Sequence, residues 1–328
     1  MINIKLQNNF LLSLQNGLNN VQIIKNWTCI FMTGIDVKKY LQGQLTIDII
    51  SLNKNHHRIS AQCNIKGKIL SIIRLFWLNN NSVVCILRTS VVEQSLREFK
   101  KYSIFSNINI FQNKKMILLG MIGLNIKKIL RDYYLVLPDY TTPVVQLNNI
   151  YILWINTPIE RFLLLMPLSL FRDFQKKNYN NICYSQIDFW QALDMASGLP
   201  IIDEKMILKF MPQSVNLDFL KGVDFNKGCY IGQEMIAKNH FLNLNKKIMY
   251  FLIGYNIFIP EIGSRITVKK SNDFYNIGIV LSVLKIDKNT IWIQAILSKK
   301  ISNSTVFYLN QDIKYPLIIF KSIFYNIS

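Results

Sequence analysis

The chain has 328 residues and carries 38 Lys and Arg against 19 Asp and Glu, which gives a net charge of +19. Half of the residues are hydrophobic and 12% are aromatic, a composition that excludes an intrinsically disordered protein. This length predicts two domains or one large one. No apolar run reaches the roughly 20 residues that span a bilayer, and the N-terminus lacks the pattern of a secretory signal. We therefore expect a cytoplasmic protein that makes no membrane contact.

The positive charge comes from a shortage of carboxylates. A typical chain is about 25% charged, with about half of that basic. Here 38 of 328 residues are basic, which is ordinary, whereas only 19 of 328 are acidic. The resulting field attracts RNA and other acidic partners at long range. Charge alone does not establish a dedicated nucleic-acid-binding protein.

The five cysteines do not form a metal or disulfide pattern. They are widely spaced, without a C-x-x-C pair, and the chain has only three histidines. This spacing argues against a disulfide framework and against a structural zinc site, so we predict no metal. The cysteines are Cys29, Cys63, Cys85, Cys183 and Cys229.

Hydrophobic patterning predicts a mixture of strands and helices up to residue 178. Runs of β-branched and apolar residues indicate strands, and apolar residues at helical spacing, such as Val92, Leu96 and Phe99, indicate helices. The predicted strands are 27–33, 66–76, 82–88, 116–119, 134–137, 150–155 and 161–166, and the predicted helices are 36–41, 89–102 and 169–178.

The clearest predicted helix covers residues 185–197. Ser185 is a suitable N-cap, with Asp188 three residues later as in a capping box. Gly198 is suited to a left-handed C-cap, and Pro200 prevents the helix from continuing.

The pattern changes to alternating short strands from about residue 247 onward. Turn residues separate these strands, and their regular spacing predicts a small antiparallel β-barrel of about 80 residues. We place the domain boundary between residues 243 and 244. The predicted strands are 248–253, 265–269, 278–283, 290–296 and 305–309.

The densest group of chemically versatile side chains lies in residues 227–234. A lysine next to a thiol favours the reactive thiolate, and the two glycines permit unusual backbone angles. The alternative is that the cysteine is a small buried hydrophobe and the glycines serve a turn. The segment consists of Lys227, Gly228, Cys229, Tyr230, Ile231, Gly232, Gln233 and Glu234.

This segment, KGCYIGQE, resembles the signature of the YgfZ family, bacterial relatives of the folate-binding aminomethyltransferase (T-protein) of the glycine cleavage system. Further blocks that resemble the family occur in the same order along the chain. These blocks are TGID at 33–36, KYLQGQLTID at 39–48, QCNIKGKI at 62–69, GLPIID at 198–203 and FMPQ at 210–213.

The resemblance implies an α+β protein with two domains. Residues 1–243 would form an aminomethyltransferase-like folate-binding region of two subdomains, and residues 244–328 the C-terminal antiparallel β-barrel. It also implies a cofactor of the tetrahydrofolate type, bound against Trp27 and Trp190. An indole face suits a flat pterin, and the alternative is that both residues are ordinary core tryptophans.

The family further implies a cytoplasmic accessory protein in tRNA modification and iron–sulfur protein maintenance. Cys229 would be its functional thiol, while Lys227, Gly228, Tyr230, Gly232, Gln233 and Glu234 complete the motif. It would bind folate and interact with tRNA-modification or iron–sulfur enzymes. Direct contact with tRNA is a further alternative. The alternatives are a non-enzymatic scaffold that binds RNA or protein, and a one-carbon transferase.

The sequence departs from its relatives at positions that bear on activity. Relatives commonly read Glu-Ala-Gly where this chain has Ala196, Ser197 and Gly198, so a carboxylate suited to the pterin is missing. Arginines that follow the cysteine motif in the family are replaced here by lysines, which lack the bidentate fork of a guanidinium.

True aminomethyltransferases place an aspartate pair near the position of Ser71, and no Asp or Glu occurs here between Asp48 and Glu93. A hydroxyl is a poor general acid or base. His56 and His57 fall in the same stretch, where their polar neighbours predict a solvated loop. We therefore predict no glycine-cleavage activity.

Overall fold

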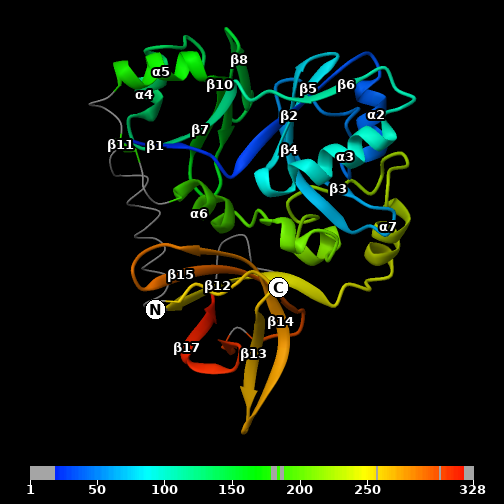
Figure 1. Ribbon diagram of the computed structural model, residues 1–328, viewed down its shortest axis with the longest axis vertical. Coiled ribbons are helices and arrows are strands. Elements are labelled where there is room, and N and C mark those ends of the chain that lie inside the picture. Colours follow the sequence, from blue (N-terminus) through cyan, green and yellow to red (C-terminus); the bar gives the residue numbers. More distant parts are fainter. Residues whose placement is uncertain (1–18, 179–182, 185–187, 256–257, 303, 321–328) are drawn as a thin grey trace. The chain divides into compact units, whose positions relative to one another are not determined.

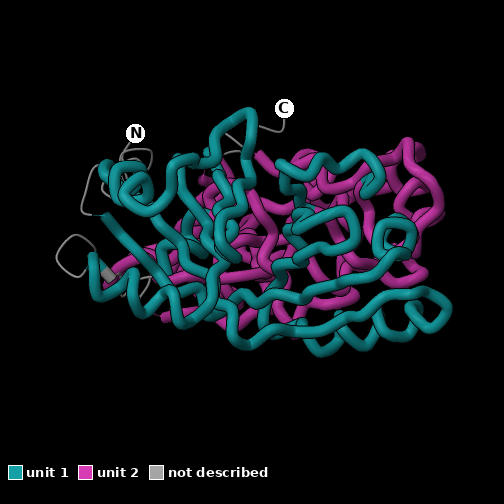
Figure 2. The backbone as a smooth tube through the Cα atoms, turned by 90° about the horizontal axis from the view of Figure 1, so that it is seen from above, with its two compact units in different colours: residues 1–42, 48–59, 73–193 teal, residues 43–47, 60–72, 194–328 magenta. Residues whose placement is uncertain are grey.

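The computed structural model describes residues 19–178, 183–184, 188–255, 258–302 and 304–320 (Figure 1). The described residues form two compact units that alternate along the sequence (Figure 2). Unit 1 falls within residues 1–42, 48–59 and 73–193, and unit 2 within residues 43–47, 60–72 and 194–328.

A six-stranded sheet lies in unit 1 and is mostly antiparallel. Its order is β11-β1-β7-β10-β9-β8, and only the β1–β11 pair is parallel. Its central strands are apolar on both faces, as expected of strands covered on both sides. The strands are β1 (Asn20–Ile23), β7 (Met116–Ile122), β8 (Val144–Leu147), β9 (Ile150–Ile155), β10 (Arg161–Pro167) and β11 (Cys183–Tyr184).

A second sheet has five strands in the order β3-β4-β5-β2-β6. The connection between β3 and β4, with the adjoining ends of both strands, supplies residues 60–72 of unit 2. The strands are β2 (Trp27–Thr33), β3 (His57–Cys63), β4 (Ile69–Asn79), β5 (Ser82–Arg88) and β6 (Asn109–Gln112).

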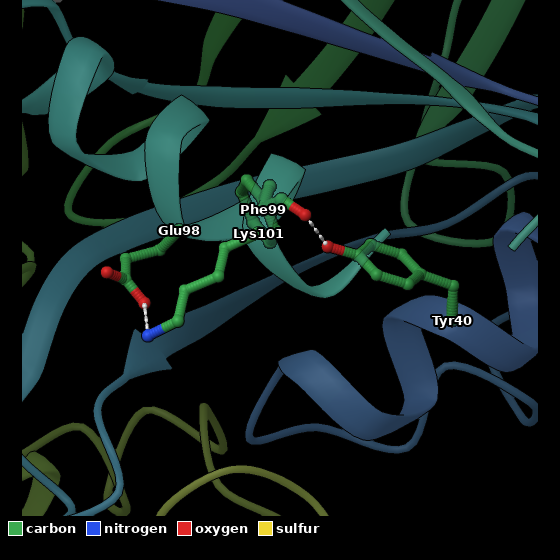
Figure 3. A network of polar contacts seen from close by, with 4 residues as sticks. All are labelled: Tyr40, Glu98, Phe99 and Lys101. Carbon is green, nitrogen blue, oxygen red and sulfur yellow. Dashed lines mark hydrogen bonds and ion pairs between the residues drawn. The ribbon is translucent and has the colours of Figure 1, made fainter. Parts of the chain in front are cut away.

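Helices pack beside these sheets. The Tyr40 hydroxyl donates to the Phe99 carbonyl at 2.5 Å and so joins α2 to α3, and an exposed Glu98–Lys101 ion pair at 4.0 Å spans one turn of α3 beside it (Figure 3). The helices are α2 (Val37–Gln44), the 3-10 turn η1 (Thr89–Val91), α3 (Val92–Tyr102), α4 (Ile126–Arg131), α5 (Leu168–Lys177) and α6 (Phe189–Ala196).

Unit 2 contains a closed barrel in the strand order β12-β15-β14-β13-β16-β17. The pairing of β12 with β17 closes it, and Leu252, Ile293 and Phe307 are among its fully buried residues. The strands are β12 (Lys247–Tyr255), β13 (Arg265–Lys270), β14 (Asp273–Lys285), β15 (Thr290–Ser298), β16 (Val306–Leu309) and β17 (Asp312–Ile319). The predicted barrel is confirmed, and its sixth strand, β17, had not been predicted.

Short helices precede the barrel in unit 2. They are η2 (Glu204–Met206), η3 (Pro212–Val215) and α7 (Gln233–Phe241). Asn216 follows η3 in a left-handed conformation and exchanges two hydrogen bonds with the Met249 backbone on β12, at 2.7 and 3.2 Å. These bonds attach the segment before the barrel to the barrel wall. The predicted division into residues 1–243 and 244–328 stays a prediction.

Two predicted elements differ from the structure. Residues 134–137 form no strand, because Leu135 and Val136 are exposed and only Tyr134 is buried. In α6 the cap is Asp188, whose carboxylate accepts the Gln191 N–H at 2.9 Å, and the predicted cap Ser185 lies outside the described residues. Gly198 ends α6 with a φ of 78°, as predicted.

Candidate functional site

The cysteine motif is held to its unit by Lys227. Its ammonium group donates to the carbonyls of Leu45 and Ile47, both at 2.7 Å, and lies 4.8 Å from the centre of the Tyr230 ring. The backbone adds a bond from the Ile231 N–H to the Gly43 carbonyl at 3.0 Å. The lysine therefore anchors the loop, a role that the sequence pattern did not predict for it.

Cys229 and Tyr230 point to opposite sides of this loop. Cys229 is exposed, whereas Tyr230 is buried, and its hydroxyl has no hydrogen-bond partner. Burial, with smaller contributions from Cys63 and Asp224, raises the pKa of Tyr230. Burial also raises the pKa of the Cys63 thiol. Cys229 is therefore accessible to solvent, and the interpretation of Cys229 as a buried hydrophobe is wrong.

The two glycines of the motif differ in what the backbone requires of them. Gly232 precedes α7 with a φ of 83°, and a Cβ there would lie 2.5 Å from the Asn64 carbonyl oxygen. A Cβ on Gly228 would meet nothing within 4 Å. Gly232 is therefore needed for the close approach of α7 to the 64–67 turn, whereas Gly228 leaves open space beside Cys229.

Motif blocks that are far apart in sequence meet in unit 2. Thr46 donates through its hydroxyl to the Gly222 carbonyl at 2.6 Å and accepts the Ala61 N–H at 2.9 Å. The Ile69 N–H bonds to the Phe210 carbonyl at 2.8 Å. The segments 43–47, 60–72, 210–213 and 227–234 thus form one structure around the motif, whose last residues, Gln233 and the exposed Glu234, open α7.

Trp27 stands at the start of β2 in unit 1, beside a guanidinium group. The carbon centre of Arg88, on the paired strand β5, lies 5.6 Å from the centre of the Trp27 ring. Trp27 is 8% exposed, and its indole N–H is buried without a hydrogen-bond partner. An unpartnered buried donor costs about 1–3 kcal/mol.

Trp190 lies on α6 and is connected to Trp27 through polar groups of the same unit. Arg88 donates to the Gln191 side chain at 3.2 Å, and the Arg161 guanidinium lies 4.4 Å from the centre of the Trp190 ring. Trp190 is 3% exposed, and one edge of its ring packs against Gly120 so closely that a Cβ there would lie 2.4 Å away. The structure thus brings both predicted tryptophans into one cluster of indoles and guanidinium groups.

Arg88, Arg161 and Gln191 were missed in the sequence. The two arginines are buried at the ends of apolar strands. The chain contains 30 lysines and only 8 arginines, so an arginine beside an apolar strand was a usable signal that a guanidinium is needed there.

His57 is not part of a solvated loop, which corrects that prediction. It begins β3, with Nε2 2.9 Å from the Trp154 carbonyl and Nδ1 3.1 Å from the Arg74 guanidinium. Since Arg74 can only donate, Nδ1 accepts and Nε2 carries the hydrogen. Burial and the neighbouring Arg74 lower the pKa of His57 to about 3. The ring is therefore neutral near pH 7.

Ser71 has a hydroxyl group where a catalytic carboxylate would be needed, and its side chain is inaccessible to solvent. It is fully buried, and its hydroxyl donates to the Gln62 side chain at 3.2 Å. Ala196, the last residue of α6, is likewise buried.

A cavity of about 640 Å³ lies elsewhere in unit 2, with Lys205, Lys209 and Phe258 in its lining, and contains none of the predicted site residues.

In the part of the chain that the structure describes, no group of three His, Cys, Asp or Glu side chains is placed to hold a metal ion. The same residues include no helix long and apolar enough to cross a membrane.

Comparison with known proteins decides the family. Residues 245–312 match the model described as the YgfZ β-barrel domain. The chain is 38% identical to a protein named tRNA-modifying protein YgfZ from Buchnera aphidicola of Acyrthosiphon pisum, over 88% of this chain and 90% of the relative. It is 43% identical to the protein of that name from Buchnera aphidicola of Baizongia pistaciae, over 84% and 86%. For the Yersinia enterocolitica protein of that name the identity is 34%, over 90% and 89%.

The chain belongs to the YgfZ family. A solved structure of the glycine cleavage system aminomethyltransferase T from Bartonella henselae aligns with this YgfZ-family chain at a TM-score of 0.79. It covers 95% of this chain and 88% of the other at 15% sequence identity, so the likeness establishes the fold alone. The predicted α+β, aminomethyltransferase-like fold with a C-terminal antiparallel barrel is confirmed.

Proposed function

We propose that this YgfZ-family protein is a folate-binding accessory protein in tRNA modification and iron–sulfur protein maintenance, with Cys229 as its functional thiol. The tRNA role is supported by the name of its relatives, which match it over most of their length. The observation that carries the role of Cys229 is the position of the motif. Lys227 and Gly232 fix the loop, and the thiol between them is exposed.

The proposal for folate rests on the cluster in unit 1. Trp27 offers an indole N–H that lacks an acceptor, and Arg88 and Arg161 place two positive charges against indole rings. A tetrahydrofolate has a flat pterin with ring acceptors and an anionic glutamate tail, and both match this set of groups. Trp27 would donate to the ligand, and Arg161 and Gln191 would fix Trp190.

We further propose that the protein is not an aminomethyltransferase. Proton transfer at the folate needs a carboxylate or histidine with access to the reacting atoms. Ser71, which stands near the position of the enzymes' aspartate pair, is buried and bonded to Gln62. The second histidine of the nearby stretch, His57, is bonded through both ring nitrogens. A cytoplasmic location completes the proposal.

The test is complementation of a bacterium that lacks its own family member, with tRNA nucleosides measured by mass spectrometry. We expect the wild-type chain to restore the missing modification and Cys229→Ala to restore less than a tenth of it. Cys183→Ala is the matched control, because that thiol is also exposed, and it should behave as wild type. Full activity of Cys229→Ala would refute the role of the thiol, and failure of the wild-type chain would refute the tRNA role.

A further inference from the structure

An aromatic cluster lies exposed at the end of α7 in unit 2. The rings of Phe225 and His240 are stacked, with centres 3.7 Å apart and planes at 18°. Phe241 meets both rings edge-on, at 6.1 Å from Phe225 and 5.1 Å from His240. Phe241 is 69% exposed, so this cluster offers an aromatic surface to solvent.

The packing of α7 explains why these rings face outward. The side chains that α7 buries are Ile236 and Asn239. Asn239 donates to the Gln213 side chain at 3.3 Å, and Gln213 donates to the Ile236 carbonyl at 2.8 Å. These bonds set the rotation of the helix, and Phe241 then falls on the other side. Phe241 therefore presents an exposed ring at the end of this helix.

Several exposed lysines lie on α7 and on the segments that follow it. Lys238 lies on α7, and the chain that leaves the helix carries Lys246 and Lys247, all exposed. The Lys299 N–H bonds to the Lys246 carbonyl at 2.9 Å, so Lys299 and its neighbour Lys300 lie beside them. No Asp or Glu occurs between residues 235 and 260 or between 288 and 311.

Three carboxylates occur near these lysines: Glu234, exposed one turn before Lys238 on α7, and the half-buried Asp218 and Asp224. Asp218 lies within the electrostatic reach of both His240 and Lys299, yet it is half-buried and burial raises the pKa of its carboxyl. Asp224 is half-buried, and its charge contributes to raising the pKa of the Tyr230 hydroxyl. His240 and Lys299 thus both lie near Asp218.

We propose that this aromatic–lysine surface, defined as Phe225, Lys238, His240, Phe241, Lys246, Lys247 and Lys299, binds unpaired nucleotides of an RNA. Bases would stack on the exposed Phe241 ring, and phosphates would lie against the lysines, which is the usual combination in proteins that bind single-stranded RNA. A protein partner fits less well, because lysines are depleted in protein interfaces. The proposal rests on the tRNA role proposed above and adds the surface that would make the contact.

The experiment measures binding of a fluorescein-labelled tRNA transcript by fluorescence anisotropy at several salt concentrations. We expect Phe241→Ala to weaken binding about 10-fold, the effect of losing one stacked base. We expect Lys246→Gln with Lys247→Gln to reduce the slope of log affinity against log salt by about 1.4, since each single-strand phosphate contact contributes about 0.7. An unlabelled single-stranded RNA should compete better than a blunt RNA duplex of equal length.

Matched controls make the same chemical changes on unit 1. Phe105→Ala removes another exposed phenylalanine, and Lys38→Gln with Lys39→Gln removes another exposed lysine pair. Both should leave affinity and salt slope unchanged. Circular dichroism melting of each variant verifies that it is folded, and neither Phe241 nor the lysine pair is in the core.

The possible outcomes separate this proposal from the proposed function. If the surface variants bind the transcript as tightly as wild type, the surface assignment is overturned, whatever complementation shows. If they restore modification poorly but the wild-type chain binds no RNA, the surface serves a protein partner and the RNA assignment is again overturned. If the wild-type chain binds RNA through this surface but fails in complementation, the inference stands and the proposed function fails.

Discussion

The residues of the cysteine motif have different structural roles, although the sequence analysis treated them as one group. Lys227 is bonded to two backbone carbonyls, Tyr230 is buried within the electrostatic reach of Cys63, and Cys229 is exposed. Burial raises the pKa values of Cys29, Cys63 and Cys85, so these three thiols are inert at neutral pH. Side-chain exposure thus leaves Cys183 and Cys229 as the thiols that can react, and the motif places Cys229 on a fixed loop.

His57 predicts a pH dependence of stability. Its pKa is about 3 in the folded protein, because of burial and Arg74, and near 6.5 when unfolded. Above pH 6.5 His57 is neutral in both states, and the contribution of this group to the free energy of unfolding is at its maximum. That contribution is lost as the pH falls from 6.5 toward 3, because the unfolded chain then binds the proton more readily than the folded protein. The free energy of unfolding should fall by about 1 kcal/mol per pH unit through this window.

Urea denaturation of wild type and His57→Gln from pH 7 to pH 5 measures this contribution. The variant should show a flatter dependence of the free energy of unfolding on pH than wild type. Equal slopes for wild type and His57→Gln would show that His57 protonates freely in the folded protein.

At the scale of elements, the start of α7 depends on one glycine of the motif. Gly232→Ala should lower the free energy of unfolding by about 1–3 kcal/mol, because its Cβ would press on the Asn64 carbonyl and its φ is 83°. Gly228→Ala should change it by less than about 0.5 kcal/mol, since a Cβ there meets nothing within 4 Å. Thermal and urea denaturation measure both, and a Gly228→Ala loss as large as that of Gly232→Ala would contradict the steric argument.

Local elements were predictable where the pattern of the chain determines them. Strands β2, β5 and β9 have the bounds that their apolar runs indicated. Strand β17 was not predicted, because it contains Pro316 and begins with three exposed residues, a pattern that does not indicate a strand. It forms a strand by pairing with β12, which closes the barrel. Residues 134–137 show the reverse, an apolar run that finds no strand partner.

At the scale of the whole molecule, the sequence could align the family blocks in order but could not place them in space. Family resemblance named Trp27, Trp190 and Cys229, whereas Arg88, Arg161 and the Gln213–Asn239 network emerged only from long-range contacts. Pairings such as Lys227 with Leu45 join residues 182 positions apart, and no local pattern encodes them. The backbone bond between Lys299 and Lys246 likewise brings together two lysines that are far apart in the sequence.

The most direct test of the central proposal is titration calorimetry of tetrahydrofolate binding to wild type, Trp27→Phe and Trp190→Ala. We predict that wild type binds, that Trp27→Phe, which lacks the unpartnered indole N–H, binds about 10-fold more weakly, and that Trp190→Ala, which loses the ring on Arg161, binds still less. Trp77→Phe, a change to another buried tryptophan of unit 1, is the control and should bind like wild type. Absence of binding by the folded wild-type chain, or equal binding by all four proteins, would contradict the folate proposal.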